Sequence, residues 1–116
     1  MNIERHHTNE RSSQLVIHRD TVYLAGQVAR DKPWADIAEQ TANALARIDA
    51  LLAEASTDKT RLLNATIWLA DIRDFPAMNQ VWMDWLPRGS GPARAVVEAR
   101  LAYPEFNVEI AVVAAR

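Results

Sequence analysis

Residues 92–115 read PARAVVEARLAYPEFNVEIAVVAA and contain two runs that are typical of β-strands, 92–100 and 107–115. Both runs are rich in small and β-branched residues, and a turn-prone Ala-Tyr-Pro-Glu segment joins them. Each run also carries a charge in apolar surroundings, Arg94 in the first and Glu109 in the second. Burying an unpaired ion costs several kcal/mol. We therefore expect Arg94 and Glu109 to be either partnered or functional.

The first run also has a simpler interpretation, because side chains alternate between the two faces of a strand. One face would hold three charges and one valine, Arg94, Val96, Glu98 and Arg100, and the other would hold Ala95, Val97, Ala99 and Leu101. A face with three charges is more often solvated than part of a site. Pattern alone therefore favours a solvent-exposed sheet face here.

The N-terminal half predicts a hairpin followed by a long helix. Residues 13–18 and 21–25 are rich in β-branched and aromatic residues, and Arg19-Asp20 forms a two-residue turn between them. Gly26 ends the second strand, where a glycine permits an unusual backbone angle, a close approach to a ligand or a simple change of direction. Apolar residues recur at helical spacing over about residues 34–55, which predicts an amphipathic helix that covers one face of a sheet.

The C-terminal half predicts a buried strand and a second helix. Residues 62–70 are apolar on both faces, so this strand needs cover on both sides. Asp74 is the predicted N-cap of the second helix, with Pro76 in its first turn. The loop 87–91, rich in Gly, Pro and Ser, then leads to Arg94. The apolar stripe of the second helix comprises Phe75, Met78, Trp82 and Trp85.

The element order ββ-α-β-α-ββ predicts an α+β fold with two helices and about five or six strands in a mixed sheet. Two helices cannot cover both faces of such a sheet, so we expect them to pack on one face. The other face stays apolar and is expected to bury against another chain. Its candidate residues are Trp68, Val97, Ala99, Val108 and Ile110, or their alternates along the same strands.

Composition excludes several classes of protein. The 116 residues suit one domain, which we expect to span residues 1–116. The net charge of −2 gives no basic field to attract nucleic acid or a membrane surface, and the lack of cysteine excludes disulfides and thiolate catalysis. No apolar run approaches the roughly 20 residues that span a bilayer, and the polar N-terminus lacks the apolar core of a signal peptide. We therefore expect a cytoplasmic protein.

The histidines raise the question of a metal site. Residues 2–8, an edge strand or a tail, contain His6 and His7. Adjacent residues of a strand point to opposite faces, so this pair cannot readily chelate one ion. The only other histidine is His18, and no cysteine is available. We therefore expect no metal.

Three motifs, in register along nearly the whole chain, resemble the RidA (YjgF-like) reactive-intermediate deaminase family. PARAVVEARL and VEIAVVAA are similar to the end of that family, VYLAGQ to its strand and Ser/Ala-Gly-Gln turn, and DIRDFPAMN to its D-x-x-D-F-x-x-x-N helix entry. The segments EQTANALARIDALLAE and NATIWLADIRDF are most similar to the small bacterial YoaB-like branch. The resemblance implies a chorismate-mutase-like fold and a homotrimer whose sheets line a central barrel, with ligand clefts between subunits.

The resemblance also implies a site that binds a small carboxylate. Arg94 occupies the position of the arginine that grips the substrate carboxylate, for which a guanidinium offers a two-pronged contact. Glu109 occupies the position of a glutamate that orients or activates water. Gly26 matches a glycine whose backbone contacts the ligand. The implied substrate-binding residues are Arg94, Gly26, Asn79, Ala25 and Val96.

The implied reaction is the hydrolysis of a 2-imino or 2-enamino acid, such as 2-aminoacrylate, to a 2-keto acid and ammonia. Arg94 would hold the carboxylate and draw electron density from C2, while Glu109 would orient or deprotonate the attacking water. Because an imine is intrinsically reactive, neither a metal nor a cofactor is needed.

Two departures from the family pattern leave an alternative open. Deaminases of the family have a tyrosine in the N-terminal segment, where this chain has Ser12, and a frequent cysteine at the position of Val96. Ser12, Ser13 or His18 could supply a polar group instead. The alternative is a trimeric binding or regulatory protein that holds a small carboxylate in the same cleft without turning it over.

Overall fold

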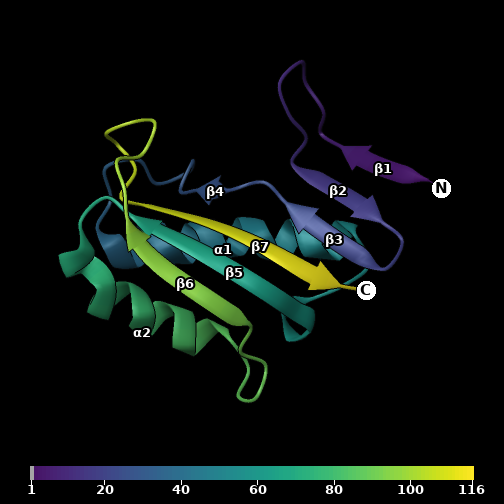
Figure 1. Cartoon of the computed structure of the whole chain (residues 1–116). Coiled ribbons are helices and arrows are strands. Elements are labelled where there is room, and N and C mark those ends of the chain that lie inside the picture. The colour runs from purple at the N-terminus through teal and green to yellow at the C-terminus, as the bar shows by residue number, and fades with distance from the viewer. Residues whose placement is uncertain (1) are drawn as a thin grey trace.

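The computed structural model describes residues 2–116; Met1, the first residue of the predicted domain, lies outside the described residues. The described chain forms seven strands and two α-helices in the predicted general order (Figure 1). Strand β1 confirms the edge-strand alternative for residues 2–8, and β4 is an additional strand. Short 3-10 turns precede β5 and α2, at Lys59–Arg61 and Ile72–Asp74. The elements are β1 (Ile3–His6), β2 (Leu15–His18), β3 (Thr21–Leu24), β4 (Gln27–Val28), α1 (Ile37–Glu54), β5 (Leu62–Leu69), α2 (Phe75–Trp85), β6 (Ala93–Glu98) and β7 (Val108–Ala115).

All strands belong to one mixed sheet in the order β1-β2-β3-β7-β5-β6, with β4 also pairing with β7. Every pairing is antiparallel except that of β5 with β6, which is parallel. A parallel pair requires a crossover connection, and α2 provides it. The two C-terminal strands are consecutive in sequence but do not pair, because β5 lies between them (Figure 1). The predicted mixed sheet is therefore confirmed, and β6 and β1 are its two edge strands.

Local sequence signals explain where the first hairpin and helix α1 begin and end. His18 pairs with Thr21, which confirms the predicted two-residue turn, and Arg19 in this turn has a φ of 58°. Asp36 is the N-cap of α1, and its side chain accepts a hydrogen bond from the backbone N–H of Glu39. Neither helix within residues 2–116 combines the length and the hydrophobicity that a membrane crossing requires.

The prediction that Asp74 is the N-cap residue of α2, with Pro76 in the first turn, is confirmed. The side chain of Asp74, however, forms no capping hydrogen bond. A capping side chain needs an extended backbone at its own residue, whereas the preceding 3-10 turn gives Asp74 helical angles of φ −79° and ψ −1°. Asp71 instead caps that 3-10 turn by accepting from the backbone N–H of Arg73.

Both helices pack on the same face of the sheet, as predicted. The core between the two helices and the sheet is apolar, and burial of its apolar side chains is the main source of stability. Figure 1 shows α1 behind the sheet and α2 beside β6. The core is built from Ala44, Leu45, Ile48 and Leu52 of α1, Ala65, Ile67 and Leu69 of β5, Met78 and Trp82 of α2, and Val108, Ile110, Val112 and Ala114 of β7.

The other face of the sheet is not covered by either helix, and we call it the open face. Val108 and Ile110, two of the residues predicted there, are instead fully buried on the helix side. Their alternates are only half-buried, because β7 alternates strictly between buried and half-buried positions. Burial of the open face against another chain stays a prediction. The open face comprises Thr66, Trp68, Ala95, Val97, Glu109, Ala111 and Val113.

Candidate functional site

Arg94, on the edge strand β6, lies against helix α2. Its Nη1 donates a hydrogen bond of 2.8 Å to Oδ1 of Asn79. Its Cζ lies 5.5 Å from the ring centroid of Trp82 and 5.9 Å from that of Phe75, which are cation–π distances. No carboxylate of residues 2–116 forms an ion pair with Arg94, so the guanidinium is positioned while most of its five donors stay free.

The spacing of α2 explains why these three side chains meet the guanidinium together. Phe75, Asn79 and Trp82 are separated by four and three residues, so they lie on one face of the helix. The amide Nδ2 of Asn79 contacts Sδ of Met83 at 3.9 Å, which leaves its carbonyl oxygen for Arg94. The family resemblance implies that Asn79 lies near the ligand, and the structure places Asn79 in a hydrogen bond with Arg94.

Glu109 lies on the open face, opposite to Arg94. Arg94 is in register with Ala65, whose side chain is buried on the helix side, and residues in register share a face. Glu109 is in register with Trp68, on the open face between the buried residues Val108 and Ile110. Glu109 is therefore not the ion-pair partner of Arg94, and one protomer alone cannot bring both charges to one small ligand.

Gly26 lies next to the Glu109 carboxylate. Residue 26 precedes β4, in which Val28 is in register with Glu109. A Cβ at Gly26 would come within 2.9 Å of Cδ of Glu109, closer than real Cβ atoms approach such an atom. Among the roles left open by the sequence, the structure supports a close approach, and the approaching group is the end of the Glu109 side chain.

The remaining predicted site residues lie farther from this carboxylate. Ala25 precedes Gly26, and its N–H donates to the backbone oxygen of Gln14 at 3.0 Å. Val96 packs against the core on the helix side. The Oγ of Ser13 bonds to Thr8, and Ser12 donates its N–H to Asn9. The fallback group His18 keeps a buried Nε2 for which the described residues provide no hydrogen-bond partner.

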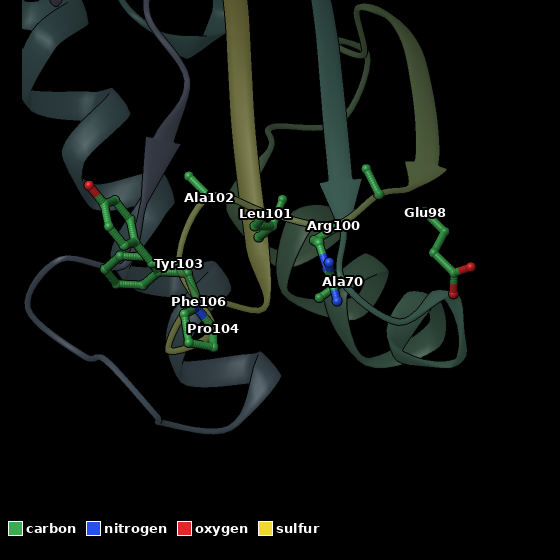
Figure 2. Close-up of a pocket in the computed structure, with 9 residues that line it drawn as sticks. Ala70, Glu98, Arg100, Leu101, Ala102, Tyr103, Pro104 and Phe106 are labelled. Atoms are coloured by element: carbon green, nitrogen blue, oxygen red, sulfur yellow. The ribbon is translucent and has the colours of Figure 1, made fainter.

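The loop between β6 and β7 forms hollows on two sides of Glu109. One, of about 110 Å³, we call the Gly26 pocket, and the other, of about 230 Å³, includes Trp68 and Arg100. Figure 2 shows the same loop from the side of a wider pocket of about 750 Å³, where Arg100 points toward Ala70 and Tyr103 lies at the far end. The Gly26 pocket is lined by Gly26, Val28, Arg30, Leu101, Ala102, Tyr103, Phe106 and Glu109.

Sequence reasoning missed Arg30 and Tyr103 as neighbours of Glu109. Both lie in connections, which the pattern identified only as loops or turns. A backbone hydrogen bond of 3.0 Å from Trp34 N–H to the oxygen of Glu105 joins the two connections. The chain therefore lacks the N-terminal tyrosine of the family pattern, yet places a tyrosine beside Glu109 from the C-terminal loop.

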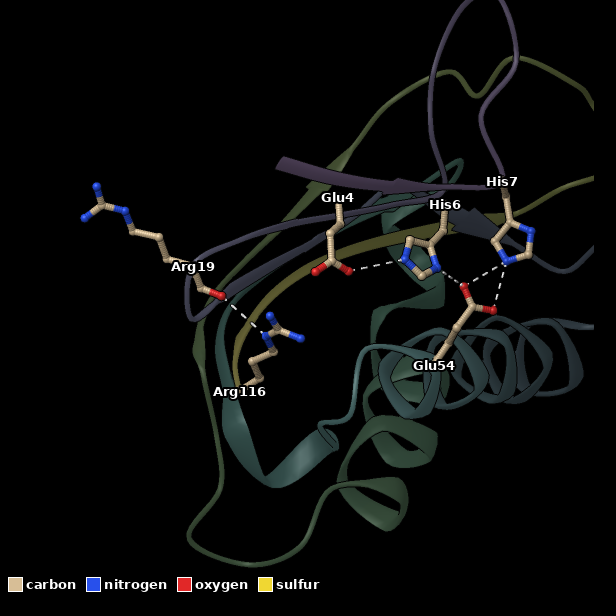
Figure 3. A network of polar contacts seen from close by, with 6 residues as sticks. All are labelled: Glu4, His6, His7, Arg19, Glu54 and Arg116. Carbon is tan, nitrogen blue, oxygen red and sulfur yellow. Dashed lines mark hydrogen bonds and ion pairs between the residues drawn. The ribbon is translucent and has the colours of Figure 1, made fainter. Parts of the chain in front are cut away.

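His6 and His7 both contact the carboxylate of Glu54, at 2.9 and 3.0 Å (Figure 3). The hydrogen bonds from His7 and then His6 lower the pKa of Glu54. The sequence argument that the two imidazoles must point apart is wrong here, because β1 ends at His6 and His7 has a φ of 55°. Within the described residues, no group of three or more His, Asp or Glu side chains is arranged so that it could hold a metal ion.

Comparisons with known proteins place the chain in a family. The sequence model described as "Endoribonuclease L-PSP" matches residues 3–116. The chain is 45% identical over 115 residues to the RutC family protein YoaB of Escherichia coli K12, covering 99% of each. It superposes with a TM-score of 0.95 on a YjgF-family protein from Neisseria meningitidis, at 44% identity, covering 100% of this chain and 96% of that one. The chain belongs to this RidA (YjgF-like) family, and the resemblance to its YoaB-like branch is confirmed.

Relatives that are named as imine deaminases are less similar to the chain than YoaB is. The 2-iminobutanoate/2-iminopropanoate deaminase of Bos taurus is 34% identical over 107 residues, covering 88% of this chain and 77% of that protein. The relatives from Escherichia coli, Haemophilus ducreyi and Haemophilus influenzae, at 45%, 42% and 41% identity, carry the RutC family name without an activity. The comparisons therefore show the family and the fold.

Proposed function

We propose that the chain is a 2-imino/2-enamino acid deaminase whose site forms between protomers of a homotrimer. The observation that carries this proposal is the pair of unpaired charges, Arg94 held by α2 with free donors and Glu109 on the open face. Neither charge forms an ion pair within residues 2–116, so both remain available to a ligand. The name of the bovine relative supports the reaction class.

The placement of the two charges supports a site that needs two chains. Arg94 is on the edge strand β6 and Glu109 on the open face, so a head-to-tail contact brings the edge of one protomer to the open face of the next. Such a heterologous contact forms a closed ring when the rotation from one protomer to the next is a whole fraction of a full turn. The family resemblance implies a ring of three copies. In this arrangement each cleft takes Arg94 from one protomer and Glu109 with Gly26 from its neighbour.

The reaction follows from the chemistry of the two groups. Arg94 binds the substrate carboxylate by charge-assisted hydrogen bonds and withdraws electron density from C2. Glu109 accepts a proton from water while the water oxygen bonds to the imine carbon and the C=N π electrons move to nitrogen. Glu109 then donates that proton to the nitrogen, which gives a carbinolamine. In a second transfer Glu109 takes the proton of the carbinolamine hydroxyl and passes it to the nitrogen; the C=O bond forms as the C–N bond breaks, and the 2-keto acid and ammonia leave. A positioned general base of this kind contributes about 10²–10⁴-fold in rate.

A second candidate is a protein that binds small carboxylates without turnover. This candidate is favoured because one protomer alone positions the Arg94 guanidinium, through Asn79, Phe75 and Trp82. A carboxylate could bind there without any general base beside it. In this case Glu109 would serve the interface rather than the chemistry.

A coupled assay separates the two candidates. A dehydratase converts serine to 2-aminoacrylate, and pyruvate formation is followed with and without the chain. The deaminase accelerates this step, Arg94→Ala removes the acceleration, and the exposed loop variant Arg88→Ala retains it. If the wild-type chain gives no acceleration but calorimetry shows that it binds 2-ketobutyrate, the binding protein is the correct reading. Full activity of Arg94→Ala contradicts both.

A further inference from the structure

We propose that Arg30 determines substrate specificity by binding an anionic group on the side chain of the imino acid, so that the chain prefers dicarboxylic 2-imino acids. The inference rests on the proposed deaminase function and names its substrate class. It follows from the size of the Gly26 pocket, the charges that line it and the lack of a partner for Arg30.

The Gly26 pocket is too small for a whole ligand and suits one substituent. Its volume of about 110 Å³ lies well below the roughly 300 Å³ at which pockets for complete small molecules begin. If water attacks the imine carbon beside Glu109, the substrate side chain is the part that can enter this space. Val28, Leu101 and Phe106 supply apolar walls around the side chain.

Arg30 is the only cation among the residues lining this pocket, and no described residue neutralises it. Its side chain forms no hydrogen bond or ion pair with residues 2–116, and the neighbouring carboxylate of Asp31 is taken by Asn43 and Arg47. The backbone of Arg30 is fixed by a hydrogen bond of 2.9 Å from its N–H to the oxygen of Val28. Arg30 is exposed and lines the pocket, so its guanidinium keeps all of its donors for an anion that enters.

Glu109 makes the preference depend on Arg30. An acidic side chain in the Gly26 pocket lies near the Glu109 carboxylate, and like charges repel. The guanidinium of Arg30 offsets this repulsion and offers the side-chain carboxylate a two-pronged contact. Without Arg30, the pocket disfavours a second carboxylate but still admits a methyl or ethyl group.

Arg100 provides a matched control. It also lines a hollow beside Glu109 and forms no ion pair with described residues, but its side chain lies on the Ala70 side of the loop, away from Tyr103 (Figure 2). Arg30→Ala and Arg100→Ala therefore remove the same charge from opposite sides of one carboxylate. A general electrostatic effect would appear in both variants.

The test compares two imines generated in situ by amino-acid oxidases, 2-iminosuccinate from aspartate and 2-iminopropanoate from alanine, with semicarbazide trapping the imine that remains. Arg30→Ala is expected to lower kcat/KM for 2-iminosuccinate by about tenfold or more, the effect of one lost charge-assisted contact, and to leave 2-iminopropanoate within about twofold. Arg30→Lys retains part of the preference. Equal loss for both imines, no loss for either, or an equal effect of Arg100→Ala overturns the inference.

A binding measurement keeps the inference testable if no imine is turned over. Calorimetry compares oxaloacetate with pyruvate on the wild-type chain and on Arg30→Ala. Tighter binding of oxaloacetate that disappears in Arg30→Ala supports the role of Arg30 even where the deaminase proposal fails. Equal binding of the two keto acids by the wild-type chain overturns the role of Arg30 whatever the outcome for turnover.

Discussion

Arg94 and Glu109 lie on opposite faces of the same sheet, Arg94 against helix α2 and Glu109 on the open face. In one protomer the backbone of the sheet separates them. Each nevertheless has its own support within the chain: Asn79 bonds to Arg94, and Gly26 leaves room for the carboxylate of Glu109. Under the proposed function, Arg94 and Glu109 are the two halves of a site that forms only between two chains.

The contact between Gly26 and Glu109 predicts the effect of adding one methyl group. Gly26→Ala places a Cβ against the Glu109 carboxylate, the end of a flexible side chain, which must turn aside. We therefore expect activity to fall by at least about tenfold while stability changes by less than about 0.5 kcal/mol. Gly91→Ala is the control, because its nearest neighbour would be 4.0 Å away. Kinetics and urea unfolding measure both effects. Unchanged activity of Gly26→Ala contradicts a positioned role for Glu109.

The open face predicts the oligomeric state. Val113 lies on this face four residues after Glu109, and a charge buried there without a partner is strongly unfavourable. We expect sedimentation velocity to show a trimer for the wild-type chain and a monomer for Val113→Glu, with loss of activity. Ala42→Glu, on an exposed position of α1 and thus in the helix layer that covers the opposite face of the sheet, is expected to remain trimeric. A trimer in both variants excludes the open face as the interface.

The ion pair of Asp71 and Arg73 predicts a dependence of stability on pH. Hydrogen bonds from Arg73 lower the pKa of Asp71 from 3.8 to about 2. A carboxyl whose folded-state pKa is lowered stabilises the fold above its unfolded pKa and loses this contribution as pH falls through its folded value. The stability difference between the wild-type chain and Asp71→Asn should therefore be constant above pH 3.8 and shrink between there and about pH 2. Urea midpoints across this range test it, and a constant difference contradicts it.

Much of the fold could be predicted from short-range signals. The hairpin at Arg19-Asp20, helix α1 and the stripe of α2 each follow from periodicity or turn chemistry within a few residues. The pairing of β5 between β6 and β7 could not be predicted this way, because it depends on contacts between segments far apart in sequence. The same limit applies to His7, whose left-handed backbone at the end of β1 breaks the alternation.

The site was predictable where the residues lie in regular elements. Alternation alone indicates that Arg94 and Val96 share a face, and helical spacing indicates that Phe75 and Asn79 do. Arg30 and Tyr103 carry no such signal, because their loops meet only through the fold, for example through the hydrogen bond from Trp34 to Glu105.

A mixing experiment tests the shared site most directly. Arg94→Ala and Glu109→Gln are each expected to lack deaminase activity as pure proteins, since every cleft then lacks one group. Co-refolding equal amounts of the two produces mixed trimers in which some clefts receive an intact Arg94 and an intact Glu109 from different protomers. Random assembly predicts recovery of about a quarter of the wild-type activity. Two variants that are inactive alone and equally inactive after verified subunit mixing would contradict a site built from two chains.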